Sequence, residues 1–283
     1  MKARGATVGL VLRRPVRMLG IEAFYTDFMA GVEDVLMEDD RELMLQVVPD
    51  MERELDAYVR WSEGDQVGAV IIVDVLVDSD PRLALVDDLG LAALVVAHPD
   101  DAGMHSCLVT DEAALVDTIV DELLGLGHRV LARVSGPLAL AHTSRRTAAF
   151  EAAVRTHGGQ PMVVEADFTA KEAQRAVTRL LDGDQPPTAM VFDNDVMAVA
   201  ALEVISSRGL RVPDDVSLVA GDDSVACRVA SPPLSAMSRD VHELGMQAGR
   251  AVVDVLSGAP VRTYAAPRPT FAARASTGPV RLA

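Results

Sequence analysis

Short apolar runs alternate with amphipathic segments along the whole chain, and this alternation constrains the fold more than any other feature of the sequence. Residues 67–73, VGAVIIV, are apolar throughout, which is typical of a strand buried on both faces of a parallel sheet. Between such runs, apolar residues recur at the three- and four-residue spacing of helices. Further strand-like runs lie at 6–12, 43–48, 92–97, 130–135, 162–166, 188–193 and 217–221. We therefore predict repeated βαβ units, with parallel sheets covered by helices on both faces.

The βαβ pattern runs in two blocks, which predicts an α/β fold of two doubly wound lobes joined by a hinge. We expect an N-terminal lobe of residues 6–126 with 241–266, and a C-terminal lobe of residues 127–240 with 267–283. No Gly/Ser/Pro-rich linker separates the blocks, so the crossings should be short, near 126–129, 237–240 and 265–269. Two lobes with such hinges form a cleft that can close on a ligand.

Composition excludes several classes of protein. The formal net charge is -16, and so acidic a surface repels a phosphate backbone; DNA contact would need a basic segment that the sequence does not contain. No apolar run approaches the ~18 residues that span a bilayer, and the uncharged span Gly5–Leu12 is typical of a strand, not a signal peptide. Cys107 and Cys227 are too few for a disulfide framework or a zinc site, so we expect half-buried, reduced thiols. A cytoplasmic protein without membrane contact is predicted.

Enzyme signatures are absent from the sequence. There is no G-x-x-x-x-G-K-[ST] and no G-x-S-x-G motif, and GLGHRV (125–130) lacks the third glycine of a dinucleotide loop and precedes a strand. His242-Glu243 has no second histidine at metalloprotease spacing. Asp195, at the start of a helix, is more simply an N-cap than a metal ligand, although four carboxylates could in principle hold a divalent ion: Asp193, Asp195, Asp222 and Asp223. We predict no catalytic residue, no cofactor and no metal site.

The stretch from Thr188 to Asp223 contains the strongest functional signal. An apolar strand runs into Asn194 and Asp195, a helix follows, and a second strand ends at Asp222. Polar residues thus stand at the carboxyl ends of consecutive parallel strands, where open α/β sheets bind their ligands. The pattern predicts a small-molecule site.

Several motifs resemble the effector-binding domain of the lactose/galactose-repressor (LacI/GalR) family of bacterial transcription regulators. The similar motifs are Phe24-Tyr25 before Gly31, LLGLGHR (123–129), SGP (135–137) followed by Arg146 and Phe150, VFDND, LRVPDDVSLVAGDD, SPPLSAMSRD and RAST (274–277). The resemblance covers essentially the whole chain. It implies a periplasmic-binding-protein-like fold of type I, a homodimer, and a small polar effector such as a sugar or polyol that closes the cleft and alters DNA binding.

Ten residues are candidate effector contacts. Arg146 offers a planar fork of donors, Asp222 can accept two hydroxyl donors from one sugar, and Phe24, Tyr25 and Phe168 could stack on a ring face. The resemblance implies the stacking role of Phe168 and a hinge position for Arg239. The complete set is Phe24, Tyr25, Asp74, His98, Arg146, Phe168, Asp193, Asn194, Asp222 and Arg239.

Structural alternatives exist for four of these candidates. Phe24 could belong to the core, Asn194 could only hold the turn before its helix, Asp222 could be a turn or cap residue, and Arg146 could be a surface residue of its helix.

The chain departs from the family pattern at several of these positions. Asp193 stands where a small residue is common, Ala97-His98 stands where an Asp-Arg pair is common, Ala220-Gly221 replaces a Gly-aromatic pair, and Glu22 replaces Asn. These changes predict a roomier and more acidic pocket, which favours a polyhydroxylated or cationic ligand over a phosphate or carboxylate.

The repressors that this chain resembles begin with a helix-turn-helix head, which we expect to be absent because the first predicted strand starts within six residues of Met1. The chain is then either a shortened form of a longer regulator, which we favour, or a naturally headless sensor. Two other classes remain open. A solute-binding receptor of a transport system shares the architecture but requires export, and a sugar- or nucleoside-processing enzyme requires a nucleophile or base that the sequence does not offer.

Overall fold

The computed structural model describes residues 7–14 and 23–281, which form two compact units. Unit 1 comprises residues up to 110 together with 240–267, and unit 2 comprises 111–239 together with 268–283. The chain therefore passes between the units at three places. Two of them, after Arg239 and after Pro267, fall where the sequence predicts crossings, whereas the first comes after Thr110 instead of near 126–129.

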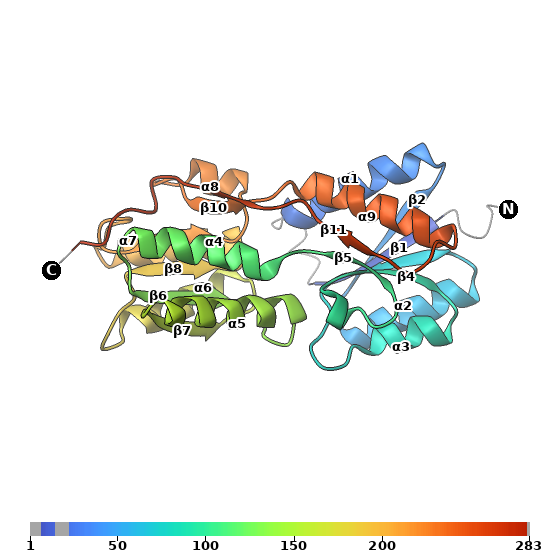
Figure 1. The fold of residues 1–283 in the computed structure, drawn as a ribbon, viewed down its shortest axis with the longest axis horizontal. Helices are drawn as coiled ribbons and strands as arrows, with labels where there is room; N and C mark the ends of the chain where they lie inside the picture. The colour runs from blue at the N-terminus through green and yellow to red at the C-terminus, as the bar shows by residue number, and fades with distance from the viewer. Residues whose placement is uncertain (1–6, 15–22, 282–283) are drawn as a thin grey trace. The chain divides into compact units, whose positions relative to one another are not determined.

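Unit 1 contains a six-stranded sheet in the order β11-β5-β4-β3-β1-β2, in which all neighbouring strands pair in parallel. The order reverses between β1 and β3, so the chain winds outward from that point in both directions. The elements are β1 (Thr7–Arg13), α1 (Ala23–Glu38), β2 (Glu42–Val48), α2 (Met51–Glu63), β3 (Ala69–Ile72), α3 (Pro81–Asp88), β4 (Ala92–Val96), the short 3-10 helix η2 (Pro99–Asp101), β5 (Ser106–Val109), α9 (Val241–Leu256) and β11 (Thr263–Ala265). Figure 1 shows this sheet with α1 and α9 on one side and α2 and α3 on the other.

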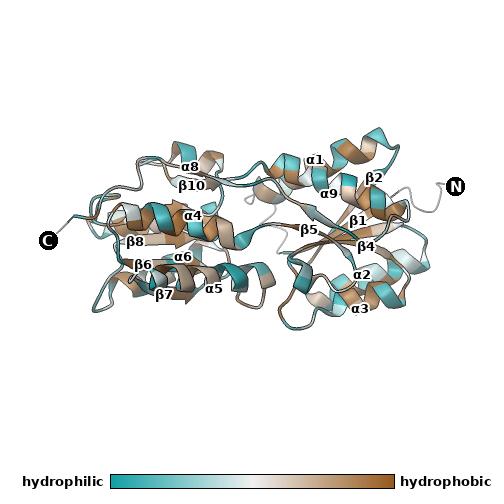
Figure 2. Ribbon diagram, viewed as in Figure 1, coloured by the Kyte–Doolittle hydropathy of each residue, from teal (hydrophilic) through white to brown (hydrophobic). Residues whose placement is uncertain are grey.

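Alternate residues of the unit 1 strands face two separate helix layers. Leu10 and Ile71 pack with α1 and α9, whereas Val70 and Ile72 pack with α2 and α3. Because both faces of the sheet are covered, its central strands are apolar throughout, as Figure 2 shows. The close approach of α1 to α9 needs glycine, since a Cβ at Gly31 would lie 2.0 Å from the carbonyl oxygen of His242.

Unit 2 repeats this plan with the strand order β12-β10-β9-β8-β6-β7, in which only β12 is antiparallel to its neighbour among the described strands. Here the order reverses between β6 and β8. The elements are α4 (Glu112–Gly125), β6 (Val130–Ser135), α5 (Ala141–Thr156), β7 (Gln160–Glu165), α6 (Ala170–Leu181), β8 (Ala189–Phe192), α7 (Asp195–Ser207), β9 (Ser217–Ala220), α8 (Val225–Val229), β10 (Ser235–Ser238) and β12 (Thr270–Ala272).

The unit 2 sheet is also covered on both faces. Phe192 and Leu218 pack with α6 and α7 on one side, and Val191 and Leu131 pack with α4 and α5 on the other. Helix α4 belongs here because its apolar face, including Ile119 and Leu123, is buried against α5 and the sheet. The sequence-based division placed this helix in the N-terminal lobe. The difference arises because the apolar spacing of α4 predicts a buried face but not which sheet that face packs against.

Helix ends largely follow the local signals in the sequence. The side chain of Thr169 accepts a hydrogen bond from the backbone N–H of Glu172 at 3.3 Å, as the Thr-x-x-Glu spacing of a capping box predicts. Gly127 follows α4 with φ +91°, in the left-handed region that favours glycine. The assignment of Asp195 as an N-cap is wrong. Asn194 caps α7, and Asp195 is the first residue of the helix.

Some features of the fold carry no clear sequence signal. Strands β5, β10, β11 and β12 are only three or four residues long and mix polar with apolar residues, so no apolar run marks them. Cys107 and Cys227 are free and buried, not half-buried as expected. Glu22 lies outside the described residues. Along the part of the chain that the structure describes, no helix combines the length and apolarity that a bilayer crossing requires.

Candidate functional site

In unit 1, two of the predicted contact residues meet at the carboxyl ends of β1 and β3. The hydroxyl of Tyr25 donates to a carboxylate oxygen of Asp74 at 2.9 Å. Arg14, directly after β1, pairs with the same carboxylate at 2.9 Å, and its guanidinium carbon lies 5.1 Å from the centre of the Tyr25 ring. Asp74 has φ +52°, an uncommon conformation for a residue with a side chain. Hydrogen-bond donors and acceptors of Arg14, Tyr25 and Asp74 therefore gather where the strand order reverses, between β1 and β3.

The other two unit 1 candidates have local roles. Phe24 is stacked on Phe28 with ring centres 6.4 Å apart, and its side chain packs against the α1/α9 side of the core, which supports the structural alternative for this residue. His98 caps η2, where its ring accepts the backbone N–H of Asp100 at 3.3 Å.

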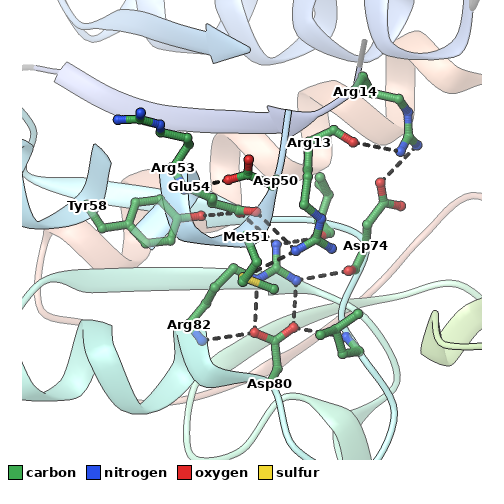
Figure 3. Close-up of polar contacts among 12 residues, drawn as sticks. Arg13, Arg14, Asp50, Met51, Arg53, Glu54, Tyr58, Asp74, Asp80 and Arg82 are labelled. Atoms are coloured by element: carbon green, nitrogen blue, oxygen red, sulfur yellow. Dashed lines mark hydrogen bonds and ion pairs between the residues drawn. The ribbon is translucent and has the colours of Figure 1, made fainter. Parts of the chain in front are cut away.

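A buried polar network lies next to Asp74, and none of its residues was identified from the sequence (Figure 3). Arg82 is paired with Glu54 at 2.8 Å and with Asp80 at 2.6 Å, and all three side chains are 1% exposed. Burial alone would lower the pKa of Arg82, but the hydrogen bond to Asp80 and the charge of Glu54 outweigh it and raise that pKa. The sequence signal is the helical spacing of Glu54 from Tyr58 and Trp61, which puts the three on one face of α2; that face is buried.

In unit 2, a buried ion pair joins β6 to the end of β8. Arg133 donates to Asp193 in a very short contact, and both side chains are almost fully buried. The second carboxylate oxygen of Asp193 accepts the backbone N–H of Gly136 at 2.7 Å. Burial lowers the pKa of Arg133 even though the negative charge of Asp193 opposes this. The charge of Asp193 is therefore compensated inside the unit, and the expectation that it makes the site more acidic is not supported.

Arg146 continues this charge network from α5. Its Nε donates to Glu112 in another very short contact, and its Nη1 lies 3.8 Å from Asp193. Burial would raise the pKa of Glu112, but the charge of Arg146 and its hydrogen bond lower it to about 2. Arg146 is thus no ordinary surface residue: its side chain is 10% exposed and is held by two carboxylates.

Asn194 and Phe168 hold the backbone at the same edge of the sheet. The amide oxygen of Asn194 accepts the backbone N–H of Met197 at 2.9 Å, and its nitrogen donates to the carbonyl of Phe168 at 3.1 Å. Phe168 has φ +67°, and a Cβ at Gly136 would lie 2.1 Å from its ring. The side chain of Asn194 therefore serves the turn, which matches the structural alternative, while the ring of Phe168 lies over Gly136.

Asp222 and Arg239 follow β9 and β10. A carboxylate oxygen of Asp222 lies 3.5 Å from Arg239, which also donates to the carbonyl of Gly221 at 3.3 Å. Burial raises the pKa of Asp222, and the nearby charges of Arg239 and Arg146 oppose this only in part. The side chain of Asp222 remains 23% exposed, so it can accept hydrogen bonds from outside the unit.

Unit 2 therefore brings together three cations and three anions at the carboxyl ends of its strands. Two of these residues, Arg133 and Glu112, were not identified from the sequence. An arginine within the apolar run 130–135 was a usable signal for Arg133, whereas Glu112 looks like any acidic residue in a first helical turn. Among the residues described in 7–14 and 23–281, no group of three or more His, Cys, Asp or Glu side chains is arranged to hold a metal ion.

Comparison with known proteins identifies the family. Residues 120–277 match the family described as a periplasmic binding protein-like domain. CelR, a transcriptional regulator of Thermobifida fusca, is 28% identical over 266 residues, which cover 90% of this chain and 76% of CelR. The repressor CytR of Escherichia coli is 30% identical over 142 residues, or 49% of this chain and 42% of CytR.

Solved structures agree over nearly the whole chain. A LacI family transcriptional regulator from Bifidobacterium animalis is 30% identical with a TM-score of 0.91, covering 99% of this chain and 100% of that one. CelR in complex with cellobiose is 26% identical with a TM-score of 0.88, covering 96% and 85%. These relatives are transcriptional regulators and not enzymes, as the sequence motifs predict for this chain. The chain belongs to the LacI family of transcriptional regulators and corresponds to their effector-binding domain.

Proposed function

We propose that this domain senses an uncharged polyhydroxylated molecule, a sugar or a polyol. The observation that carries the proposal is that each sheet gathers polar side chains beside its topological switch point, between β1 and β3 in unit 1 and between β6 and β8 in unit 2. We propose Tyr25, Asp74, Arg146, Phe168 and Asp222 as the effector contacts.

Charge balance favours a neutral ligand over an ionic one. In unit 2, the guanidinium groups of Arg133, Arg146 and Arg239 are each paired with a carboxylate. An anionic or cationic ligand would have to displace one of these partners and leave a buried charge uncompensated. A hydroxyl group can both donate and accept, so a sugar can bond to Arg146 and to Asp222 while every ion pair stays intact. The complex of the relative CelR with cellobiose supports this ligand class.

The remaining candidates act as supports in this proposal. Asp193, Asn194 and Arg239 hold the backbone and the guanidinium groups in place, and Phe24 and His98 belong to the surrounding structure. Effector binding favours one of two conformations of the regulator and so changes its affinity for operator DNA. DNA is contacted by a part of the regulator other than this acidic domain, whose net charge is -16.

A thermal-shift and calorimetric screen tests the proposal. The panel contains cellobiose, ribose, other pentoses and hexoses, polyols, a phosphorylated sugar and a polyamine. A ligand at ~100 times its Kd stabilises by ~2.7 kcal/mol, which corresponds to roughly 5–10 °C in Tm. We expect a neutral sugar or polyol to give this shift, and Arg146→Ala and Asp222→Ala to abolish it. The exposed Arg155→Ala is the matched control. A shift produced only by the anion or the polyamine would refute the proposed ligand class.

We further propose that the regulator is a cytoplasmic homodimer. Val225 and Val229, four residues apart on α8, are 64% and 75% exposed, an apolar pair that a second copy could cover. Val229→Lys should then convert a dimer into a monomer in sedimentation velocity, whereas the exposed Met104→Lys should not. A monomeric wild-type protein at micromolar concentration would contradict the proposal.

A further inference from the structure

The segment between β3 and α3 has an irregular backbone that must be held in place by other residues. It runs from Val73 to Asp80, and Asp74 and Asp78 have φ of +52° and +64°. Non-glycine residues adopt such values only where the surrounding structure enforces them. Asp74 is the residue of this segment that accepts the hydroxyl of Tyr25. The position of this carboxylate therefore depends on what fixes the segment.

Arg82 is the side chain that fixes it. The Nη1 of Arg82 donates to the carbonyl of Val73 at 2.9 Å, and its Nη2 donates to the carbonyl of Asp74 at 2.9 Å. The other donors bond to Asp80 Oδ1 at 2.9 Å, Asp80 Oδ2 at 2.6 Å and Glu54 Oε1 at 2.8 Å. A guanidinium group has five N–H donors, and each of them has an acceptor here (Figure 3).

The two carboxylates complete the support. Asp80 Oδ2 also accepts the backbone N–H of Leu76 at 2.9 Å, so the segment is bonded at a third point. Glu54 comes from α2 and also accepts the hydroxyl of Tyr58 at 2.9 Å, a bond that does not involve the segment itself. Burial raises the pKa of Asp80, but the hydrogen bonds from Arg82 and the charge of Arg82 lower it below its ordinary value. The Asp80–Arg82 pair therefore remains charged at neutral pH.

We infer that Arg82, held by Asp80 and Glu54, is a positioning residue that sets effector affinity without touching the effector. Arg82 fixes the carbonyl groups of Val73 and Asp74, which flank the Cα of Asp74. It therefore directs the Asp74 carboxylate toward Tyr25 and Arg14. Lysine cannot replace it, because one ammonium group cannot reach two carbonyls and two carboxylates in a planar arrangement. The consequence for affinity rests on the proposed function, whereas the effect on the segment does not.

Hydrogen–deuterium exchange tests the positioning role without any ligand. In Arg82→Lys, the amides of residues 74–80 should exchange about tenfold faster or more, while those of β1, β3 and α1 stay protected. Asp80→Asn is a second variant that keeps the shape of the side chain and should loosen the same segment. Tyr58→Phe is the matched control, because it removes a hydrogen bond from Glu54 but none from the segment. Equal acceleration throughout unit 1, or none in residues 74–80, would overturn the inference.

A double-mutant cycle with cellobiose then tests the link to affinity by calorimetry. Arg82→Lys should weaken binding about tenfold in the wild-type background but hardly at all in Asp74→Asn, because the two residues act as one unit. Tyr58→Phe should leave the affinity unchanged. Additive losses would show that Arg82 does not act through Asp74. If wild-type protein binds neither cellobiose nor any other neutral member of the sugar panel, the proposed function fails, and the exchange experiment alone decides the positioning role.

Discussion

Removing one partner of the buried Arg133–Asp193 pair should strongly destabilise unit 2. The Asp193→Asn variant keeps the shape of the side chain, and its amide oxygen can still accept the N–H of Gly136. It removes the negative charge that compensates Arg133 and that also lies 3.8 Å from Arg146. Two guanidinium groups would then lie close together in a buried environment, with Glu112 as the carboxylate that still pairs with Arg146.

The expected loss of folding stability follows from the burial of the Arg133–Asp193 ion pair. Breaking a buried ion pair by removing one partner costs about 3–5 kcal/mol, which for a unit of this size lowers Tm by roughly 6–20 °C. Arg133→Met should cost less than Asp193→Asn, because the remaining carboxylate of Asp193 still has the cation of Arg146 and the N–H of Gly136. The double variant removes both charges and should recover most of the loss, to within about 1–3 kcal/mol of wild type.

Urea denaturation and calorimetry of wild type, the two single variants and the double variant measure the coupling energy between Arg133 and Asp193. Arg175→Met provides the matched control, because Arg175 pairs with Glu172 at 2.7 Å but is 62% exposed, and such pairs contribute about 0–1 kcal/mol. Additive losses in the double variant, or a loss in Asp193→Asn no greater than in Arg175→Met, would refute the conclusion that the pair is buried and charged.

Three further predictions concern pH. The pKa of Glu112 is lowered from 4.5 to about 2. Its ionised carboxylate therefore contributes about 3 kcal/mol to the unfolding free energy above pH 4.5, and this contribution is lost as the pH falls toward 2. In urea titrations, the unfolding free energies of Glu112→Gln and wild type should converge near pH 2. Burial raises the pKa of Asp222, so the folded state loses stability as the pH rises through that pKa. In calorimetry at pH 7, Asp222→Asn should be at least as stable as wild type, but it should bind sugar less well. Burial lowers the pKa of His128, although its hydrogen bond to the Gly278 carbonyl opposes this. Stability should therefore fall as the pH drops below 6.5. In thermal melts across pH 5–8, His128→Gln should lack this loss of stability at low pH.

The sequence predicted the fold well wherever the signal is local. The apolar run 67–73 contains β3, and apolar residues at helical spacing, such as Leu244, Ala248 and Val252, lie in α9 (Val241–Leu256). These assignments succeed because a strand buried on both faces and a helix with one apolar face each leave their own periodicity in the sequence. The crossing near residue 126 was misplaced because α4 packs against α5 and the sheet of unit 2. The apolar spacing within α4 does not show which elements it packs against.

The candidate site was predicted less completely than the fold. Position at a strand end was sufficient to select Asp74 and Asp222, since parallel strands bring their carboxyl ends to one edge of a sheet. Arg146 lies on α5 instead, and it was selected for its planar fork of donors and through the family resemblance. Position at a strand end could not separate residues that face a ligand from those that support the backbone, as the bonds of Asn194 to Met197 and Phe168 show. That distinction depends on which hydrogen-bond partners a side chain finds after folding.

The sequence alone therefore determined the βαβ architecture, the family and the edges of the sheets where polar residues gather, because each of these is recorded in residues that are close along the chain. Only the tertiary structure decided the charge pairing. Arg133 meets Asp193 and Arg82 meets Glu54 across separations of 60 and 28 residues, and neither member of a pair marks the other in the sequence. The physical reason is that a buried charge requires a compensating partner from whichever element packs against it, and packing is a property of the folded chain.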